Sequence, residues 1–434
     1  MICRAAASAF ASILLVTLVI VGWPARAVAD DRESSYEVWL VDQSNSPGKT
    51  YGGSIAIFDG EDISGRSASR ATPVATIDLG GATAALCVAE TAANPVRPHM
   101  IFFNHEQSHA VLSFVASGHV VFFHAATREP VGCVRTSPGA GGARQAHAAY
   151  PTPDGAMVIV ANQNGKLLER ILTDYEAGSF VLDAAATLDL AACTTPNGVA
   201  CQGPVLRPDN APICAFVPSD NGVSFVSLRG GGMFVVDHTA MPMQIVGEYT
   251  SAHVGGNGCG FVEARGRVFM TSGGGTATNL FEFAAYRMPM TGYSPDNPPG
   301  QPHVQLLFED DTDHRDAHGT VATRKERYVW MLDRAANVAE VFDAITGKRI
   351  NTVSLVSRFS ADPTPDLGVL SPDGSRIFIS LRGPVPLSGD PHASTGTTPG
   401  LGVIQVHADG RRGQMKAIVR ISNIDGGVER ADAH

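Results

Sequence analysis

The sequence lacks any extended run of Lys or Arg, and its 434 residues carry a formal net charge of −10. Proteins that bind nucleic acids or anionic lipids need a clustered positive surface. We therefore expect no nucleic acid among the partners of this chain, and no attraction to a membrane surface.

Several motifs of catalysis and cofactor binding are also missing. The sequence contains no Gly-x-Ser-x-Gly elbow, no glycine-rich phosphate loop followed by Lys and no Cys-x-x-Cys-His of covalent haem. The glycine runs at Gly230 and Gly273 precede expected strands rather than helices, so they predict tight turns. These absences argue against the common serine hydrolases, nucleotide-binding enzymes and c-type cytochromes.

Long hydrophobic runs are absent outside the N-terminus, where Arg4 is followed by an apolar stretch from Ala5 to Gly22 and small residues up to Ala29. This pattern is typical of a secretory signal peptide that is cut after Ala29. It predicts a signal peptide over residues 1–29 and a periplasmic or secreted protein over residues 30–434. A retained membrane anchor is the competing interpretation, but the apolar stretch barely reaches the length of a bilayer span.

Cysteine is scarce, with seven residues in the chain, and Cys3 would leave with the signal peptide. The six that remain are an even number in an oxidising compartment, which predicts three disulfides. The expected pairs are Cys193 with Cys201, Cys214 with Cys259, and Cys87 with Cys133. The first follows from a turn-rich local loop and the second from repeat position; spacing alone does not decide the last two.

Long helical periodicity is almost absent too, and short β-branched and aromatic runs alternate with Gly, Pro, Asn and Asp clusters. A unit of three such runs recurs at a period of roughly 45 to 65 residues, the range of four-stranded propeller blades. Clear copies begin at Ala146, Ala211, Gly256, Ala317 and Asp366, and two looser copies precede them. The sequence therefore predicts an all-β, seven-bladed β-propeller of four-stranded antiparallel blades.

Turn motifs within these units carry a family resemblance. Ser-Pro-Asp-Gly at Ser371, Thr-Pro-Asp-Gly at Thr152 and Asp-Ala-Ile-Thr-Gly-Lys at Asp343 resemble the turns of the YVTN-type periplasmic propellers. This resemblance implies the fold but no function. Two segments, 288–305 and 383–400, interrupt the repeat and are expected to be surface loops.

Histidines recur where the innermost strand of a blade is expected to begin. The residues at these points are His105 or His109, His147, Asp209 with Asn210, His253, His318 and Asp366. Neutral imidazole is a common ligand of copper and zinc, and a ring of histidines from separate strands can hold a metal. Histidines at such places also cap strands and hydrogen-bond the backbone, and this alternative stays open.

Arginines recur where the second strand of a blade is expected to end, at Arg229, Arg334 and Arg382. A guanidinium suits a small oxyanion, so these three are candidate catalytic residues. Other polar residues at the same points are Asn162, Gln163, Thr271 and Ser272. In the alternative interpretation, the arginines pair with nearby carboxylates, for which Asp209, Asp316, Asp333 and Asp366 are the candidates.

The histidine register is similar to that of the copper-bearing seven-bladed propellers of the nitrous-oxide reductase and thiocyanate dehydrogenase type. That resemblance implies copper ligands at His105, His147, His253 and His318, with Asp209 as a carboxylate contributor. The chain departs from the reductase pattern in lacking a cupredoxin domain and a paired-histidine motif. The resemblance therefore does not extend to electron delivery.

The leading hypothesis is a metal-dependent oxidoreductase, with copper, that acts on a small anionic molecule. The second hypothesis is a non-catalytic propeller that takes a protein partner on its rim. The third is a lactonase-like hydrolase with calcium or zinc held by Asp209, Asn210, Asn257 and Asp366. A separate acidic cluster of Asp310, Asp311, Asp313 and His314 suits calcium, or is a solvated loop without the EF-hand spacing.

Overall fold

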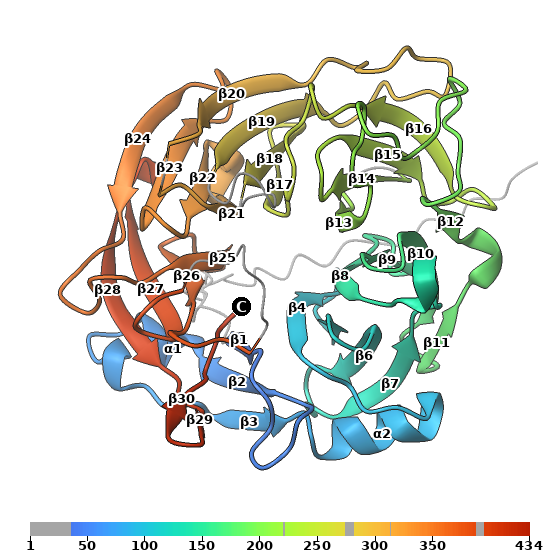
Figure 1. Ribbon diagram of the computed structural model, residues 1–434. Coiled ribbons are helices and arrows are strands. Elements are labelled where there is room, and N and C mark those ends of the chain that lie inside the picture. The colour runs from blue at the N-terminus through green and yellow to red at the C-terminus, as the bar shows by residue number, and fades with distance from the viewer. Residues whose placement is uncertain (1–35, 220–221, 274–281, 313, 388–394) are drawn as a thin grey trace, which may run out of the picture. The chain divides into compact units, whose positions relative to one another are not determined.

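A computed structural model describes residues 36–219, 222–273, 282–312, 314–387 and 395–434, which form seven antiparallel sheets in a ring (Figure 1). Consecutive strands pair within each sheet, and in every sheet except that of β1 the first strand lies nearest the centre of the ring. The predicted seven-bladed propeller of four-stranded antiparallel blades is thereby confirmed. The predicted signal peptide and its cleavage point lie outside the described residues.

The first three blades fill residues 37–189. Blade 1 contains β1 (Glu37–Asp42), β2 (Ser54–Asp59) and β3 (Ala75–Asp78). Blade 2 contains β4 (Pro98–Phe103), β5 (His109–Phe114), β6 (His119–His124) and β7 (Pro130–Arg135). Blade 3 contains β8 (Ala146–Pro151), β9 (Met157–Asn162), β10 (Leu167–Asp174), β11 (Ser179–Leu182) and the short β12 (Leu188–Asp189).

The remaining blades follow in chain order. Blade 4 contains β13 (Pro212–Phe216), β14 (Val223–Leu228), β15 (Met233–Asp237) and β16 (Gln244–Tyr249). Blade 5 contains β17 (Phe261–Ala264), β18 (Arg267–Gly273), β19 (Phe283–Pro289) and β20 (Gln305–Asp310). Blade 6 contains β21 (Ala317–Ala322), β22 (Tyr328–Asp333), β23 (Val338–Asp343) and β24 (Arg349–Ser354). Blade 7 contains β25 (Pro365–Leu370), β26 (Arg376–Leu381), β27 (Gly400–His407) and β28 (Arg412–Arg420), followed by a hairpin of β29 (Ile424–Asp425) and β30 (Val428–Glu429).

The ring closes by pairing segments from opposite ends of the described chain. Asp42 of β1 forms an antiparallel bridge with Ala433, and the Gln43 N–H donates to the Asp432 carbonyl at 3.0 Å. The His434 N–H donates to the Val41 carbonyl, also at 3.0 Å. Residues 431–434 thus serve as the innermost strand of blade 1. Closure removes the open edges that a curved sheet would otherwise expose.

The strands form because apolar residues in short runs bury themselves between neighbouring blades. Most positions of the central strands are buried, as in β14 and β22, and their β-branched and aromatic side chains fill the contacts between sheets. The Ser-Pro-Asp-Gly and Thr-Pro-Asp-Gly turns are stabilised in the same way. Ser371 and Thr152 donate a hydroxyl hydrogen bond to the Asp two residues on, and the Gly that follows has φ near +70°.

All three predicted disulfides are formed: Cys87–Cys133, Cys193–Cys201 and Cys214–Cys259. Such a set is typical of proteins from an oxidising, extracytosolic compartment. The first lies at the periphery, between the helix α2 (Ala82–Thr91) and β7, and the second closes a local loop. The third joins the entry segments of blades 4 and 5 and so lies near the centre of the ring.

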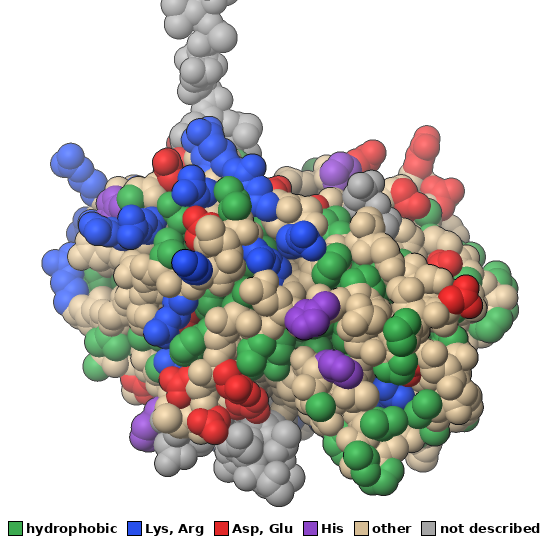
Figure 2. Space-filling model, turned by 90° about the horizontal axis from the view of Figure 1, so that it is seen from above, with side chains coloured by type: hydrophobic (Ala, Val, Ile, Leu, Met, Phe, Trp, Pro, Cys, Tyr) green, Lys and Arg blue, Asp and Glu red, His purple; other side chains and the backbone are tan. Residues whose placement is uncertain are grey.

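Helices contribute little beyond α2 and the one-turn α1 (Gly60–Ser64). Among the described residues, no helix has the length and apolar character needed to cross a bilayer. The loop between β19 and β20 coincides with the predicted insertion at 288–305; part of the second insertion, 388–394, lies outside the described residues. On the face drawn in Figure 2, hydrophobic side chains are scattered among polar ones, and Lys and Arg gather toward one side.

Candidate functional site

One position recurs at the start of every innermost strand. Strand pairing in blades 2, 3, 6 and 7 matches Pro98, Ala146, Ala317 and Pro365 with the last residue of the second strand. The residue that follows each of them sits in a register shift, which turns its side chain relative to a regular strand. These residues are His99, His147, His318 and Asp366.

The other three blades complete this set of seven. In blade 1, Ala433 pairs with Asp42 and is followed by His434. In blade 4 the equivalent place holds Ile213. In blade 5 the first paired residue is Phe261, and Cys259 precedes it by two residues. We call His99, His147, His318, Asp366 and His434 the central cluster. Four imidazoles and one carboxylate, each from a different blade, therefore face the centre of the ring.

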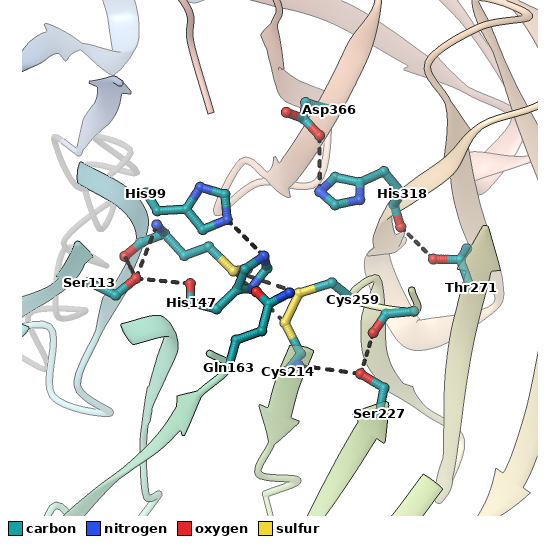
Figure 3. The surroundings of a disulfide bond; sticks show 12 residues. His99, Ser113, His147, Gln163, Cys214, Ser227, Cys259, Thr271, His318 and Asp366 are labelled. Carbon is teal, nitrogen blue, oxygen red and sulfur yellow. Dashed lines mark hydrogen bonds and ion pairs between the residues drawn. A yellow bond between two sulfur atoms is a disulfide. The ribbon is translucent and has the colours of Figure 1, made fainter. Parts of the chain in front are cut away.

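Asp366 connects the central cluster. Its Oδ1 lies 3.1 Å from His318 Nε2, and its Oδ2 lies 2.8 Å from His434 Nδ1. Figure 3 shows His318 directed at this carboxylate. The His318, Asp366 and His434 side chains can each offer one ligand atom, and these atoms lie within 4.8 Å of one another. That spacing is compatible with their binding a shared metal ion.

Two buried arginines, Arg382 and Arg334, form ion pairs with the Asp366 carboxylate. The Arg382 guanidinium donates to Asp366 Oδ2 at 2.8 Å. It also makes a bidentate ion pair with Asp432, in which each of the two N–H···O contacts is 2.8 Å long. Arg334 makes a similar pair with Asp316, at 2.8 and 2.9 Å, and reaches Asp366 Oδ1 at 3.4 Å. Such two-pronged contacts fix the orientation of both partners.

His99 and His147 form the second part of the cluster. Their Nε2 atoms face each other at 3.3 Å, and the His99 ring stacks on His434 with 3.8 Å between ring centroids (Figure 3 shows the His99–His147 contact). Two nitrogens bound tetrahedrally to one metal at 2.0–2.1 Å would lie about 3.3 Å apart. His99 Nδ1 and His434 Nε2, both buried, have no hydrogen-bond partner among the described residues. A metal ion is one partner that would satisfy such nitrogens.

The protonation states favour ligand behaviour. Burial, together with the neighbouring His434 and His147, holds the pKa of His99 well below its usual value. Burial and the charge of Arg334 do the same to the pKa of His318, against the opposing pull of Asp366. Burial alone would raise the pKa of Asp366, but the surrounding imidazoles and guanidiniums outweigh it and hold that pKa well below its usual range. Neutral imidazoles beside an ionised carboxylate are the forms that bind metals.

The buried charges around the cluster do not cancel, and the excess is negative. Arg334 and Arg382 carry two positive charges against the three negative charges of Asp316, Asp366 and Asp432. Among these carboxylates and guanidiniums, negative charges therefore exceed positive charges by one. An added cation would reduce the cost of burying that charge.

The structure brings together only some of the residues predicted from the sequence. His147 and His318 belong to the central cluster, and Arg334 and Arg382 lie directly behind it. His105 is exposed in the turn between β4 and β5, and His109 begins β5, where its ring packs near Tyr175.

Three further candidates lie apart from the cluster's contacts. His253 is exposed, and its Nδ1 pairs with Thr250 at 2.9 Å. Asp209 is held by Arg229 at 2.6 Å and by Lys166 at 3.3 Å. Arg229, Arg334 and Arg382 are thus each paired with a carboxylate, which is the arrangement of the alternative interpretation. Asp333 pairs instead with Arg315, at 2.6 Å.

The remaining expectations concern the acidic loop and the calcium-type donor set. Asp310 pairs with Arg315 at 3.4 Å and accepts a hydrogen bond from Thr312, and Asp313 lies outside the described residues. Asn210 donates its side-chain amide to the Leu190 carbonyl. Since Asp209 is committed to two cations, this donor set is less suited to calcium than the sequence suggests.

Sequence reasoning missed His99 and His434. A small residue or Pro precedes each member of the cluster, but Ala252-His253 and Pro302-His303 share this pattern outside it, so the pattern alone does not identify the site. The five dipeptides of the cluster are Pro98-His99, Ala146-His147, Ala317-His318, Pro365-Asp366 and Ala433-His434. The first residue of each pair is buried against the neighbouring strand, which limits its size.

Comparison with solved structures supports the fold. A protein from Lactobacillus plantarum matches with a TM-score of 0.56 at 12% identity, covering 89% of this chain and 97% of that one. The β-propeller domain of Cps50 (Swd1) from Myceliophteria thermophila matches with a TM-score of 0.52 at 7% identity, covering 82% and 96%. A functionally unknown protein from Desulfotomaculum acetoxidans matches with a TM-score of 0.50 at 12% identity, covering 88% and 99%.

No protein-family model matches the sequence, and no curated protein matches it either. Identities this low show a shared architecture and nothing about activity. The comparisons therefore establish that this chain is similar to β-propellers in fold, and its function has to be argued from the central cluster.

Proposed function

We propose that the central cluster binds copper and that the protein is a periplasmic or secreted oxidoreductase acting on a small molecule. One observation carries this proposal: four imidazoles and a carboxylate from five separate blades converge, and two of the buried imidazole nitrogens lack a partner among the described residues. Imidazole suits copper, and copper is the strongest binder of the first-row divalent metals.

The protein's own residues would play distinct roles. His318, His434 and Asp366 would supply the ligand atoms that already lie within 4.8 Å of one another, beside the facing nitrogens of His99 and His147, and bound copper would supply one-electron redox chemistry. Arg382 and Arg334 are positioning residues, because they fix the Asp366 carboxylate through charge-assisted hydrogen bonds.

A negatively charged substrate would be attracted by the metal ion rather than by the arginines. Both guanidiniums are already engaged by buried carboxylates, so a substrate anion would find little free positive charge on the arginines. The three disulfides and the apolar N-terminal stretch of the sequence support a periplasmic or secreted location.

The test is the metal content of the protein from a periplasmic expression host, measured by elemental mass spectrometry. We expect stoichiometric copper in the wild type and its loss in the double variant His147→Ala, His318→Ala. The matched control is His105→Ala, His253→Ala, which removes two exposed histidines and should keep the copper. Equal copper in both variants, or a folded wild type that takes up none from a copper solution, would refute the proposal.

A second candidate function is a non-catalytic binding propeller. The full pairing of Arg334 and Arg382 with buried carboxylates favours it, because such a network can fill the centre of a ring structurally. This function predicts a metal-free protein in the same experiment, and partner binding that survives the His147→Ala, His318→Ala double substitution.

A further inference from the structure

The Cys214–Cys259 disulfide lies where the central cluster has a gap. Cys259 lies two residues before β17, the first strand of blade 5, and Cys214 follows the ring position of blade 4 in β13. Both cysteines are buried. Unlike the peripheral and loop disulfides, this bond therefore lies beside the histidines of blades 2 and 3, as Figure 3 shows.

Soft donor atoms surround this disulfide. The sulfur of Met100 lies 3.9 Å from Cys214 Sγ and 3.7 Å from Cys259 Sγ. A ring nitrogen of His147 and the two Sγ atoms all lie within 4.8 Å of one another. Met100 is buried, so its thioether has little contact with water. Two cysteines, one thioether and one imidazole thus converge from four blades.

The distances match those of a soft-metal site. Two sulfurs bound tetrahedrally to one metal at 2.3 Å would lie about 3.8 Å apart. Met100 already sits at this spacing from both Cys sulfurs. The two cysteine sulfurs are joined in the disulfide, and its reduction would free both as ligands.

We propose that Cys214 and Cys259 form a redox-gated site for monovalent copper. A dithiol reductant transfers two electrons and two protons to the disulfide; the S–S bond breaks, two thiols form and the reductant becomes a disulfide. Cu(I) then binds both sulfurs together with Met100 and His147, and the two thiol protons are released. Thiolate and thioether ligands select Cu(I), so the oxidised protein does not bind the ion here and the reduced protein does.

This site differs from that of the proposed function in oxidation state and in ligands. The two share His147, but Cys214, Cys259 and Met100 have no part in the copper site of the oxidised protein. Either proposal can therefore fail without the other. A His318→Ala variant impairs the oxidised-state site and leaves Cu(I) uptake by the reduced protein intact.

The experiment is a Cu(I) titration of the full-length protein against a coloured Cu(I) chelator, without oxygen, before and after reduction. We expect reduction to create one additional Cu(I) equivalent, with sulfur scattering in the copper X-ray absorption spectrum. Met100→Leu keeps the disulfide and should weaken Cu(I) binding by at least about tenfold. Substitution of residues that only surround the ligands of a metal site already lowers metal affinity by about this factor. Cys214→Ser, Cys259→Ser should abolish the additional equivalent.

The matched control is Cys193→Ser, Cys201→Ser, which removes a loop disulfide and should leave the additional equivalent unchanged. Unchanged binding in Met100→Leu, or no additional uptake after thiol titration shows Cys214 and Cys259 reduced, would overturn the inference. These outcomes do not depend on whether the double cysteine variant folds.

Discussion

Arg229 and Arg382 occupy the same position in their blades but very different surroundings. Each follows the last residue of the second strand, and the N–H of each donates to a backbone carbonyl that precedes the innermost strand. The Arg229 side chain is 39% exposed beside Asp209, whereas the Arg382 side chain is 3% exposed between Asp366 and Asp432. A repeated sequence position therefore gives a surface ion pair in one blade and a buried network in another.

Neighbouring blades account for this difference. Blades 6, 7 and 1 each place an acidic residue near Arg382 or Arg334, and their ring positions hold His318, Asp366 and His434. Blade 4 instead places Ile213 at the ring, and in blade 5 the disulfide-bonded Cys259 lies just before the first strand. Buried charges are stable only when fully paired, so the polar network is confined to the side of the ring that supplies its partners.

The largest effect is expected for Arg382→Met, which keeps a long side chain but leaves Asp366 and Asp432 without their main cation. Breaking a buried ion pair from one side costs about 3–5 kcal/mol. Denaturant unfolding should show this loss of unfolding free energy. A loss no greater than that of Arg229→Met would contradict the view that the two positions differ by burial.

A smaller effect is expected from pH on the metal-free protein. Since the pKa values of His99 and His318 are lowered in the folded state, the unfolded chain binds more protons below the usual histidine pKa. Their neutral forms support folding above about pH 6.5, and this support is lost as pH falls, by about 1.4 kcal/mol per pH unit for each histidine.

The measurement is unfolding free energy from pH 7.5 to 5. His99→Gln and His318→Gln should each flatten the slope, and the exposed His253→Gln serves as the control. An identical slope in all three variants would mean that the central histidines are not the titrating groups.

The smallest effect is expected for Arg229→Gln, which removes the partly exposed pair with Asp209. Pairs of this kind contribute at most about 1 kcal/mol, and salt screens them. Unfolding in low and high salt should show a small difference that shrinks as salt rises. A loss of several kcal/mol would place Arg229 in the same class as Arg382.

The fold was predictable because its signals are local. Short strand runs, Pro-Asp-Gly turns and a recurring strand–turn unit depend only on nearby residues, and repeat position also predicted the Cys214–Cys259 pair. The site was less accessible because its members meet through ring closure. His434 joins His99 only when residues 431–434 pair with β1, at the other end of the described chain.

Strand boundaries explain the other differences. His105 was assigned to a strand start but occupies the turn after β4, so the ring position of blade 2 falls on His99. Which arginine becomes buried depends on carboxylates of adjacent blades, such as Asp432 for Arg382, and no pattern within one repeat contains that information.

Copper X-ray absorption spectroscopy of the oxidised, copper-loaded protein tests the central claim most directly. Copper binding by the central cluster predicts a shell of nitrogen and oxygen ligands at about 2.0 Å with the outer scattering of several imidazoles, and weaker imidazole scattering in His318→Ala. A spectrum without imidazole scattering, or one unchanged by His318→Ala, would contradict copper binding by the central cluster.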